Sequence, residues 1–167
     1  FAQSLKMKYE DEQEDIVQMV LDATQNYQLK LTESRLCNWQ RALFPTEKNT
    51  HYKLVVGRYR DDATGPMQVV SGAMGKERVH FEAPPAGKVP NEMKLFLKWF
   101  NADSNLDPVI KAAIAHLWFL TIHPFDDGNG RIARALTDLM LTRGDNFPQR
   151  FYSMSAEIRN QRNSYYE

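Results

Sequence analysis

The spacing of apolar residues along the chain predicts a mainly helical protein. Apolar positions recur every three or four residues over five stretches, which are 12–27, 32–44, 90–101, 108–122 and 128–144. Thr32 and Asp107 precede two of these stretches as N-cap residues do, and Gly144 is a natural stop for the last one. A sixth stretch over 153–167 is more polar but keeps near-helical spacing. The pattern therefore favours a mainly α fold.

The middle of the chain has a different pattern and predicts β structure. Residues 53–59 and 67–71 are rich in β-branched and aromatic side chains, 72–76 has the composition of a turn, and 77–82 alternates. The Pro84–Pro85 pair ends this region, because proline has no backbone donor for a strand ladder. Together these segments predict a hairpin. By itself such a hairpin is a surface element that covers a core.

Composition excludes several classes of partner. A chain of 167 residues suits one domain with a sizeable core, and 21 basic residues balance 21 acidic ones. Without a basic field we expect neither nucleic acid nor an anionic membrane as a partner. The longest apolar run, 112–122, is interrupted by His116 and is too short to span a bilayer. Cys37 is the only cysteine and no signal peptide is visible, so we expect a buried thiol in a reducing, cytoplasmic setting.

The chemistry of the chain concentrates in residues 123–134, which read His-Pro-Phe-Asp-Asp-Gly-Asn-Gly-Arg-Ile-Ala-Arg. This segment lies between two predicted helices, and Gly128–Gly130 opens the second. The first N–H groups of a helix lack internal partners, and the helix dipole makes that end partly positive. Glycines let a ligand approach this backbone closely, so the turn is a candidate phosphate cradle.

Charged side chains of the same segment extend this interpretation. Arg131 and Arg134 lie three residues apart and can reach further phosphate oxygens with their planar donor groups. Asp127 is too close to those phosphates to be tolerated alone, and a shared Mg²⁺ explains it. His123 is then the group that accepts a proton near neutral pH. The set suits a site that handles a polyphosphate beside a hydroxyl group.

Two other kinds of site fit the residues less well. A metal site of His116, His123 and Asp127 fails because seven helical residues separate the two histidines by roughly 10 Å along the axis, whereas metal–ligand bonds are about 2 Å long. His116 is better assigned to the core or to a supporting layer. Gly128-x-Gly130-x-x-Ala133 also fits a dinucleotide fingerprint, but that motif needs a preceding strand, and the preceding stretch is helical.

Residues 123–134 resemble the signature of the Fic family, His-x-Phe-x-(Asp/Glu)-Gly-Asn-Gly-Arg-x-x-Arg, and match every defined position. The similarity extends well outside this loop, to the segments 22–27, 42–46, 67–86 and 165–166, which look like those of Fic proteins with an additional N-terminal domain. On this resemblance residues 16–167 form the Fic domain. Residues 1–15 are charged and weakly periodic, and we expect them to be a linker from a missing N-terminal region.

The resemblance implies a fold and an activity. The expected fold is a helical bundle with a small β-hairpin flap over the active-site loop. The expected enzyme is a nucleotidyltransferase, a protein adenylyltransferase that moves AMP from Mg-ATP to a Ser, Thr or Tyr hydroxyl of a target protein. ATP is then a substrate and Mg²⁺ the metal. One alternative is that the same site serves removal of AMP, or transfer of UMP, phosphate or phosphocholine. A non-catalytic nucleotide-binding regulatory module is a further alternative.

Individual roles follow from the same resemblance. His123 is the general base, Asp127 holds Mg²⁺, and Phe125 is a buried anchor for the loop. The remaining motif positions bind the phosphates, and they are Gly128, Asn129, Gly130, Arg131 and Arg134. Residues of the flap that dock the target and border the nucleotide are Val79, His80, Phe81 and Glu82. Tyr165 and Tyr166 border the adenosine.

Regulation is implied as well. Many Fic proteins are held inactive by a helix bearing (Ser/Thr)-x-x-x-Glu-(Gly/Asn), whose glutamate pairs with the second motif arginine, here Arg134. Ser153-x-x-x-Glu157 comes nearest in this chain, but Ile158 breaks the pattern. We therefore expect an inhibitory helix either in cis, upstream of this chain, or in trans from a partner.

Overall fold

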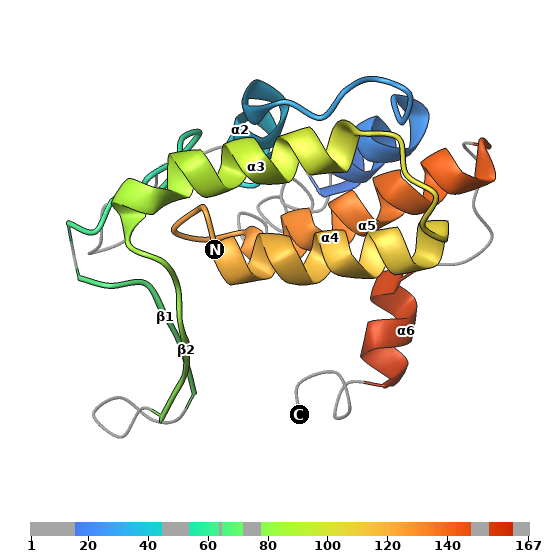
Figure 1. Cartoon of the computed structure of the whole chain (residues 1–167). Helices are drawn as coiled ribbons and strands as arrows, with labels where there is room; N and C mark the ends of the chain where they lie inside the picture. Colours follow the sequence, from blue (N-terminus) through green and yellow to red (C-terminus); the bar gives the residue numbers. More distant parts are fainter. Residues whose placement is uncertain (1–15, 45–53, 64, 72–77, 148–153, 162–167) are drawn as a thin grey trace, which may run out of the picture.

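The computed structural model describes residues 16–44, 54–63, 65–71, 78–147 and 154–161. A helix over 16–25 comes first in this part of the chain. The elements that follow are α2 (Glu33–Ala42), β1 (Gln68–Ser71), β2 (Arg78–Glu82), the 3₁₀ helix η1 (Ala86–Lys88), α3 (Val89–Asn101), α4 (Pro108–Ile122), α5 (Asn129–Asp145) and α6 (Met154–Asn160). The predicted mainly α architecture with a hairpin is confirmed (Figure 1).

The helices α4 and α5 form the centre of the bundle. They run antiparallel and side by side, α3 packs against α4, and α2 packs against α5 (Figure 1). Aromatic side chains fill the space between these elements, and Phe96, Phe119 and Phe125 are completely buried. The ring centroids of Phe96 and Phe119 lie 5.8 Å apart. Burial of one such side chain contributes about 1.5–3 kcal/mol to folding.

Local capping chemistry sets the starts of α2 and α4, as the sequence predicts. The Thr32 hydroxyl accepts a hydrogen bond of 3.1 Å from the backbone N–H of Arg35. The Asp107 carboxylate accepts one of 2.8 Å from the N–H of Val109. These bonds satisfy N–H groups that have no partner inside the helix.

The predicted end of α5 is wrong by one residue. The helix includes Gly144 and continues to Asp145, and Asn146 closes it with φ 50°, in the left-handed region. Gly144 has a packing role instead, because a Cβ atom there would overlap the ring of Pro108 at the start of α4. This glycine lets the two helices approach each other closely.

The predicted strand over 53–59 is wrong for its described part, residues 54–59, which are irregular. Two of their backbone N–H groups donate to side chains. The N–H of Val55 donates to the Asp126 carboxylate at 2.9 Å, and the N–H of Gly57 donates to the Gln40 amide oxygen at 2.5 Å. Tertiary contacts therefore override the local β-propensity of this segment.

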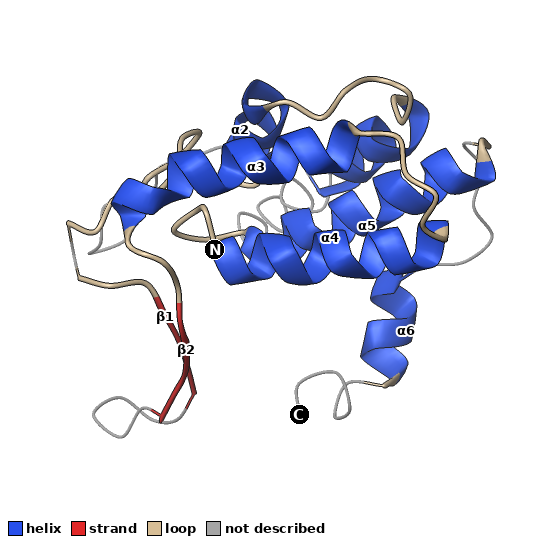
Figure 2. Ribbon diagram, viewed as in Figure 1, coloured by secondary structure: helices blue, strands red, loops and turns tan. Residues whose placement is uncertain are grey.

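The other two strands pair as an antiparallel hairpin. Val69 lies opposite Phe81 and Val70 opposite Val79, with an irregularity in the register between the two pairs. All residues of β1 and β2 are exposed. The hairpin leaves the bundle at the end where α4 joins α5 and projects away from the helices (Figure 2).

Other predictions have mixed outcomes. Cys37 is a buried free thiol, as expected. No helix among the described residues is long and apolar enough to cross a membrane. The predicted linker over 1–15 and the two tyrosines Tyr165 and Tyr166 lie outside the described residues.

Candidate active site

The motif segment forms a closed loop between α4 and α5, and Phe125 and Asn129 hold it together. The Asn129 amide accepts a hydrogen bond of 3.0 Å from the N–H of Phe125 and donates one of 2.6 Å to its carbonyl oxygen. Phe125 is completely buried, as predicted for an anchor, and its ring lies 5.7 Å from that of Tyr59. Because both ends of the Asn129 amide are used, this side chain shapes the loop.

His123 ends α4 and carries a ring with a defined orientation. Its backbone is left-handed, with φ 50° and ψ 60°. The ring Nδ1 lies 3.2 Å from the carbonyl oxygen of Leu120. A carbonyl oxygen only accepts, so Nδ1 carries the proton and Nε2 holds a free lone pair. Burial lowers the pKa of His123 below its usual range, and the positive charge of Arg60 acts in the same direction. The ring is therefore a neutral base at pH 7.

His116 lies apart from this chemistry. It is buried, and its Nδ1 lies 3.1 Å from the hydroxyl of Thr137 on α5. Burial lowers the pKa of His116 as well. Its place in the core agrees with the argument that it does not share a metal ion with His123.

The start of α5 presents backbone N–H groups that have no partner inside the helix. The first intrahelical hydrogen bond runs from the N–H of Ile132 to the carbonyl oxygen of Gly128, at 3.0 Å. The N–H groups of residues 129–131 precede it and have no partner inside the helix. Gly128 has φ 90°, and a Cβ there would stand 3.1 Å from Leu43. A Cβ at Gly130 would lie 3.7 Å from the Arg134 guanidinium, with no closer contact in the described part of the chain. Among the described residues, Gly130 thus leaves room for a ligand at this helix end.

Two arginines and one carboxylate surround the same helix end. Arg131 packs over the ring of Phe44 at 5.0 Å, and its guanidinium lies 3.7 Å from the carboxylate of Asp127. The Asp127 side chain is 61% exposed. No hydrogen bond or ion pair holds the Arg134 guanidinium within the part of the chain that the structure describes. Both arginines thus keep donors for an anionic ligand.

Asp127 fits a Mg²⁺ ion that arrives with phosphates. No group of three His, Cys, Asp or Glu side chains that would suit a metal gathers among the residues described. Mg²⁺ usually binds through one or two carboxylates together with substrate phosphates, and it keeps several waters. A single exposed carboxylate beside the start of α5 meets this requirement. It does not form a site for a tightly held structural metal.

The structure adds residues that the sequence did not indicate. Asp126 occupies an undefined motif position, and its carboxylate, whose pKa is raised by burial, accepts the N–H of Val55. Arg60 is completely buried and donates from Nε to the carbonyl oxygen of His123 at 2.7 Å. No local pattern predicts either contact, because the partners lie more than 60 residues apart.

The predicted flap residues lie together on β2. Val79, His80, Phe81 and Glu82 are all exposed. His80 contacts the hydroxyl of Ser71 at 2.6 Å, and Glu82 accepts from Gln68 at 2.8 Å, so both side chains pair across the hairpin. The root of the hairpin reaches the motif through Arg60, which donates to the carbonyl oxygen of Pro84.

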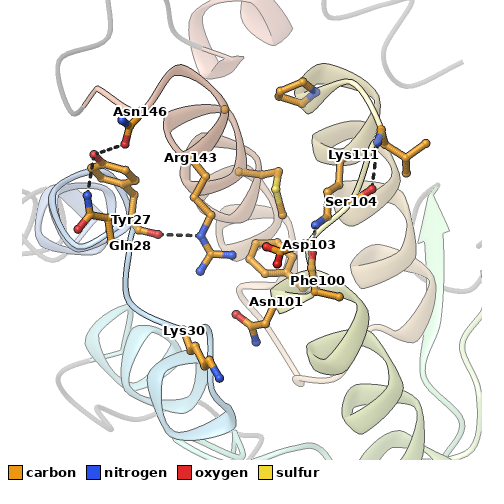
Figure 3. Close-up of a pocket in the computed structure, with 15 residues that line it drawn as sticks. Tyr27, Gln28, Lys30, Phe100, Asn101, Asp103, Ser104, Lys111, Arg143 and Asn146 are labelled. Carbon is orange, nitrogen blue, oxygen red and sulfur yellow. Dashed lines mark hydrogen bonds between the residues drawn. The ribbon is translucent and has the colours of Figure 1, made fainter.

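A cavity of about 510 Å³ lies at the opposite end of α4 and α5 and contains no motif residue (Figure 3). Two of the cations that line it, Lys111 and Arg143, bind main-chain oxygens. Lys111 donates to the carbonyl of Ala102 at 2.6 Å, and Arg143 donates to the carbonyl of Tyr27 at 2.7 Å. Lys111 and Arg143 therefore link the ends of helices. We take the motif loop, and not this cavity, as the candidate active site.

Comparisons with known proteins agree with this assignment. The model of the Fic/DOC family matches residues 30–141. The protein adenylyltransferase fic-1 of Caenorhabditis elegans is 46% identical over 57 residues, which are 33% of this chain and 11% of that protein. The protein adenylyltransferase Fic of Drosophila yakuba is 39% identical over 85 residues, 50% of this chain and 16% of that protein.

Solved structures show the same fold. A Fic-domain-containing signaling protein from Bacteroides thetaiotaomicron superposes with a TM-score of 0.64 and 30% identity, over 80% of this chain and 48% of that one. A Caenorhabditis elegans Fic-1 structure gives a TM-score of 0.57 and 25% identity, over 83% of this chain and 36% of that one. The chain thus spans less than half the length of these relatives.

Proposed function

Because the chain belongs to the Fic/DOC family, we propose that it is a protein adenylyltransferase that moves AMP from ATP to a hydroxyl side chain of a target protein. The observation that carries the proposal is the proximity of a base to an anion site. The free Nε2 of His123 stands at the end of α4, and the open N-terminus of α5 follows after a loop of only six residues, 123–128. Relatives named protein adenylyltransferase support the same activity.

The proposed reaction combines removal of a proton by His123 with displacement of pyrophosphate from ATP. Nε2 of His123 accepts the proton of the target hydroxyl, while the oxygen of that hydroxyl attacks the α-phosphorus of ATP. The bond between the α-phosphorus and the bridging oxygen to the β-phosphate breaks, and pyrophosphate leaves opposite the new bond. Catalysis rests mainly on positioning and on stabilisation of charge.

Backbone donors and arginines hold the phosphates in this proposal. The main-chain N–H groups of Asn129 and Gly130 bind the α-phosphate region, because the Asn129 amide is committed to Phe125. Arg131 and Arg134 bind the outer phosphates. We assign Asp127 as the residue that would hold Mg²⁺, and the bound ion would neutralise phosphate charge.

In this proposal the hairpin flap docks the target protein. A two-stranded hairpin is marginally stable alone, and every residue of β1 and β2 is exposed. The main chain of a target adds to the free edge of this hairpin, with the Val79–Glu82 segment bordering the site. We further assign Tyr165 and Tyr166 to the adenosine pocket, and Arg134 to the glutamate of an inhibitory helix, supplied in cis or by a partner.

Transfer from ATP labelled at the α-phosphate tests the function directly. The chain is compared with His123→Ala, with and without Mg²⁺, using a cell lysate and the chain itself as acceptors. Thr121→Ala is a matched control, because this exposed residue lies on α4 close to His123. We expect label on protein that needs Mg²⁺ and His123, with ATP affinity retained in His123→Ala. Bound ATP without any transfer of label would contradict the proposal.

A further inference from the structure

One buried arginine joins the motif loop to the root of the hairpin. Arg60 Nε donates to the carbonyl oxygen of His123 at 2.7 Å, and Nη2 donates to that of Pro84 at 2.5 Å. The third nitrogen, Nη1, pairs with Asp62 at 2.9 Å, and the side chain is completely buried. A single planar guanidinium therefore joins its own segment, at Asp62, to two distant ones, at Pro84 and His123.

Asp62 extends this connection to the segment behind the hairpin. While one carboxylate oxygen binds Arg60, the other accepts the N–H of Ala86 at 2.7 Å. Ala86 begins η1, which follows β2 after the two prolines. The N–H of Ala83 donates to the carbonyl of Met67 at 2.9 Å and closes the hairpin at its root. The arginine and the aspartate thus fix where the hairpin leaves the bundle.

The carbonyl that Arg60 binds belongs to a residue with an uncommon backbone. His123 is left-handed, with φ 50°, and a non-glycine residue keeps that conformation only when its surroundings enforce it. Its N–H is held by Phe119 O at 3.0 Å and its carbonyl by Arg60. The ring direction depends on this backbone, because the side chain projects from it.

We propose that Arg60 is a positioning residue that holds His123 and the root of the hairpin in one fixed arrangement. The proposal rests on the proposed function, in which His123 is the base and the hairpin docks the target. It adds that the distance between base and docked hydroxyl is set by Arg60, and that a point charge alone does not replace the planar guanidinium.

Arg60→Lys is the decisive variant, since it keeps the charge but offers one nitrogen to three acceptors. Arg58→Lys is the matched control, because Arg58 lies two residues earlier with a side chain 68% exposed, and its guanidinium lies 3.5 Å from the carboxylate of Asp61. In Arg60→Lys we expect kcat for target modification to fall by roughly 10- to 100-fold, the scale of a misplaced reacting group. ATP affinity should stay within about twofold, because the phosphate site is untouched. Arg58→Lys should match the wild type.

Two readouts do not require transfer. Amide hydrogen exchange should become faster at Ala83, Ala86 and His123 in Arg60→Lys. The NMR resonances of the His123 ring should also shift. A purely structural role would lower the melting temperature without changing kcat well below that temperature. Asp62→Asn is a milder second variant, which weakens the hold on Ala86 and should mainly raise exchange at the hairpin root.

The outcomes separate this proposal from the proposed function. If the wild-type chain transfers no label, the proposed function fails, while exchange and ring resonances still decide the role of Arg60. A folded Arg60→Lys with wild-type exchange, ring resonances and kcat would overturn the proposal. If Arg60→Lys does not fold, wild-type exchange at Ala86 in a folded Asp62→Asn would overturn it.

Discussion

The ring of His123 is oriented by the helix that it ends: its Nδ1 lies 3.2 Å from the carbonyl oxygen of Leu120. This contact places the proton on Nδ1 and leaves Nε2 as the acceptor. In its proposed role as the base, His123 therefore does not need a separate carboxylate to orient its ring. Its neutral form depends on burial, which lowers the pKa.

The activity should consequently persist into mildly acidic solution. The pKa of histidine is about 6.5 in an unfolded chain, and burial lowers that of folded His123. Transfer should hold at pH 6.5 and decline only as the pH falls through the lowered pKa. A profile of kcat/KM against pH, with an NMR titration of the ring assigned by its absence in His123→Ala, checks this. An acidic limb above pH 6.5 would contradict it.

The same shift has a consequence for stability. Between the folded and unfolded pKa values the unfolded chain binds more protons, so the free energy of unfolding falls as the pH decreases below about 6.5. Burial lowers the pKa of His116 too, and its contribution has the same sign. Urea unfolding at pH 7.5 and pH 5.5 measures the effect, which should be smaller in His123→Ala. If the free energy of unfolding falls by the same amount in both proteins, His123 contributes nothing to the pH dependence of stability.

Gly128 and Gly130 should respond differently to alanine. At Gly128 the left-handed backbone costs about 1–2 kcal/mol for a residue with a Cβ, and the new atom also presses on Leu43. Gly128→Ala should therefore lose at least that much stability. Gly130→Ala has room and lies in a helix, so its stability should be unchanged or higher by up to about 1 kcal/mol.

Gly130→Ala should also weaken nucleotide binding. The methyl group of Gly130→Ala lies at the open helix end where phosphate is proposed to approach, so ATP affinity should drop while the fold remains intact. Thermal unfolding and calorimetric titration with ATP measure the two effects separately. Wild-type ATP affinity in Gly130→Ala would argue against close approach of the phosphates to this backbone.

Asp127→Asn should change the metal requirement without changing stability. The side chain is 61% exposed, so the free energy of unfolding should stay within about 0.5 kcal/mol of the wild type. Half-maximal transfer should need roughly an order of magnitude more Mg²⁺, since an amide is a weaker ligand than a carboxylate. Asp103→Asn, an exposed residue at the far end of the bundle, is the control. An unchanged Mg²⁺ requirement in Asp127→Asn would contradict the assignment of this aspartate as a metal ligand.

Replacing the hairpin should separate target docking from nucleotide binding. Because the Ala83 N–H already binds Met67 O, a Gly-Gly turn can replace 68–82. All strand residues are exposed, so the core should stay folded and bind ATP while label on target protein disappears. Val79→Thr should change transfer little, because strand addition uses the main chain. Wild-type labelling of target by the shortened chain would exclude the hairpin as the docking element.

Much of this architecture was predictable because its causes are local. Thr32 and Asp107 cap helices through atoms two or three residues away, and the bounds predicted for α4 agree with the structure. Residues 54–59 behave differently. Their composition favours a strand, yet Asp126 and Gln40, distant in sequence, bind their backbone donors.

The sequence by itself determined the helices, the hairpin and the order of chemical groups in the motif, since capping, periodicity and glycine conformation act over a few residues. Only the tertiary structure decided what each group contacts. It committed the Asn129 amide to Phe125 and used Gly144 for close packing with Pro108. It also brought Arg60 to the carbonyl of His123, 63 residues away. Such contacts depend on the whole chain having folded, because the bundle places their partners within hydrogen-bonding distance.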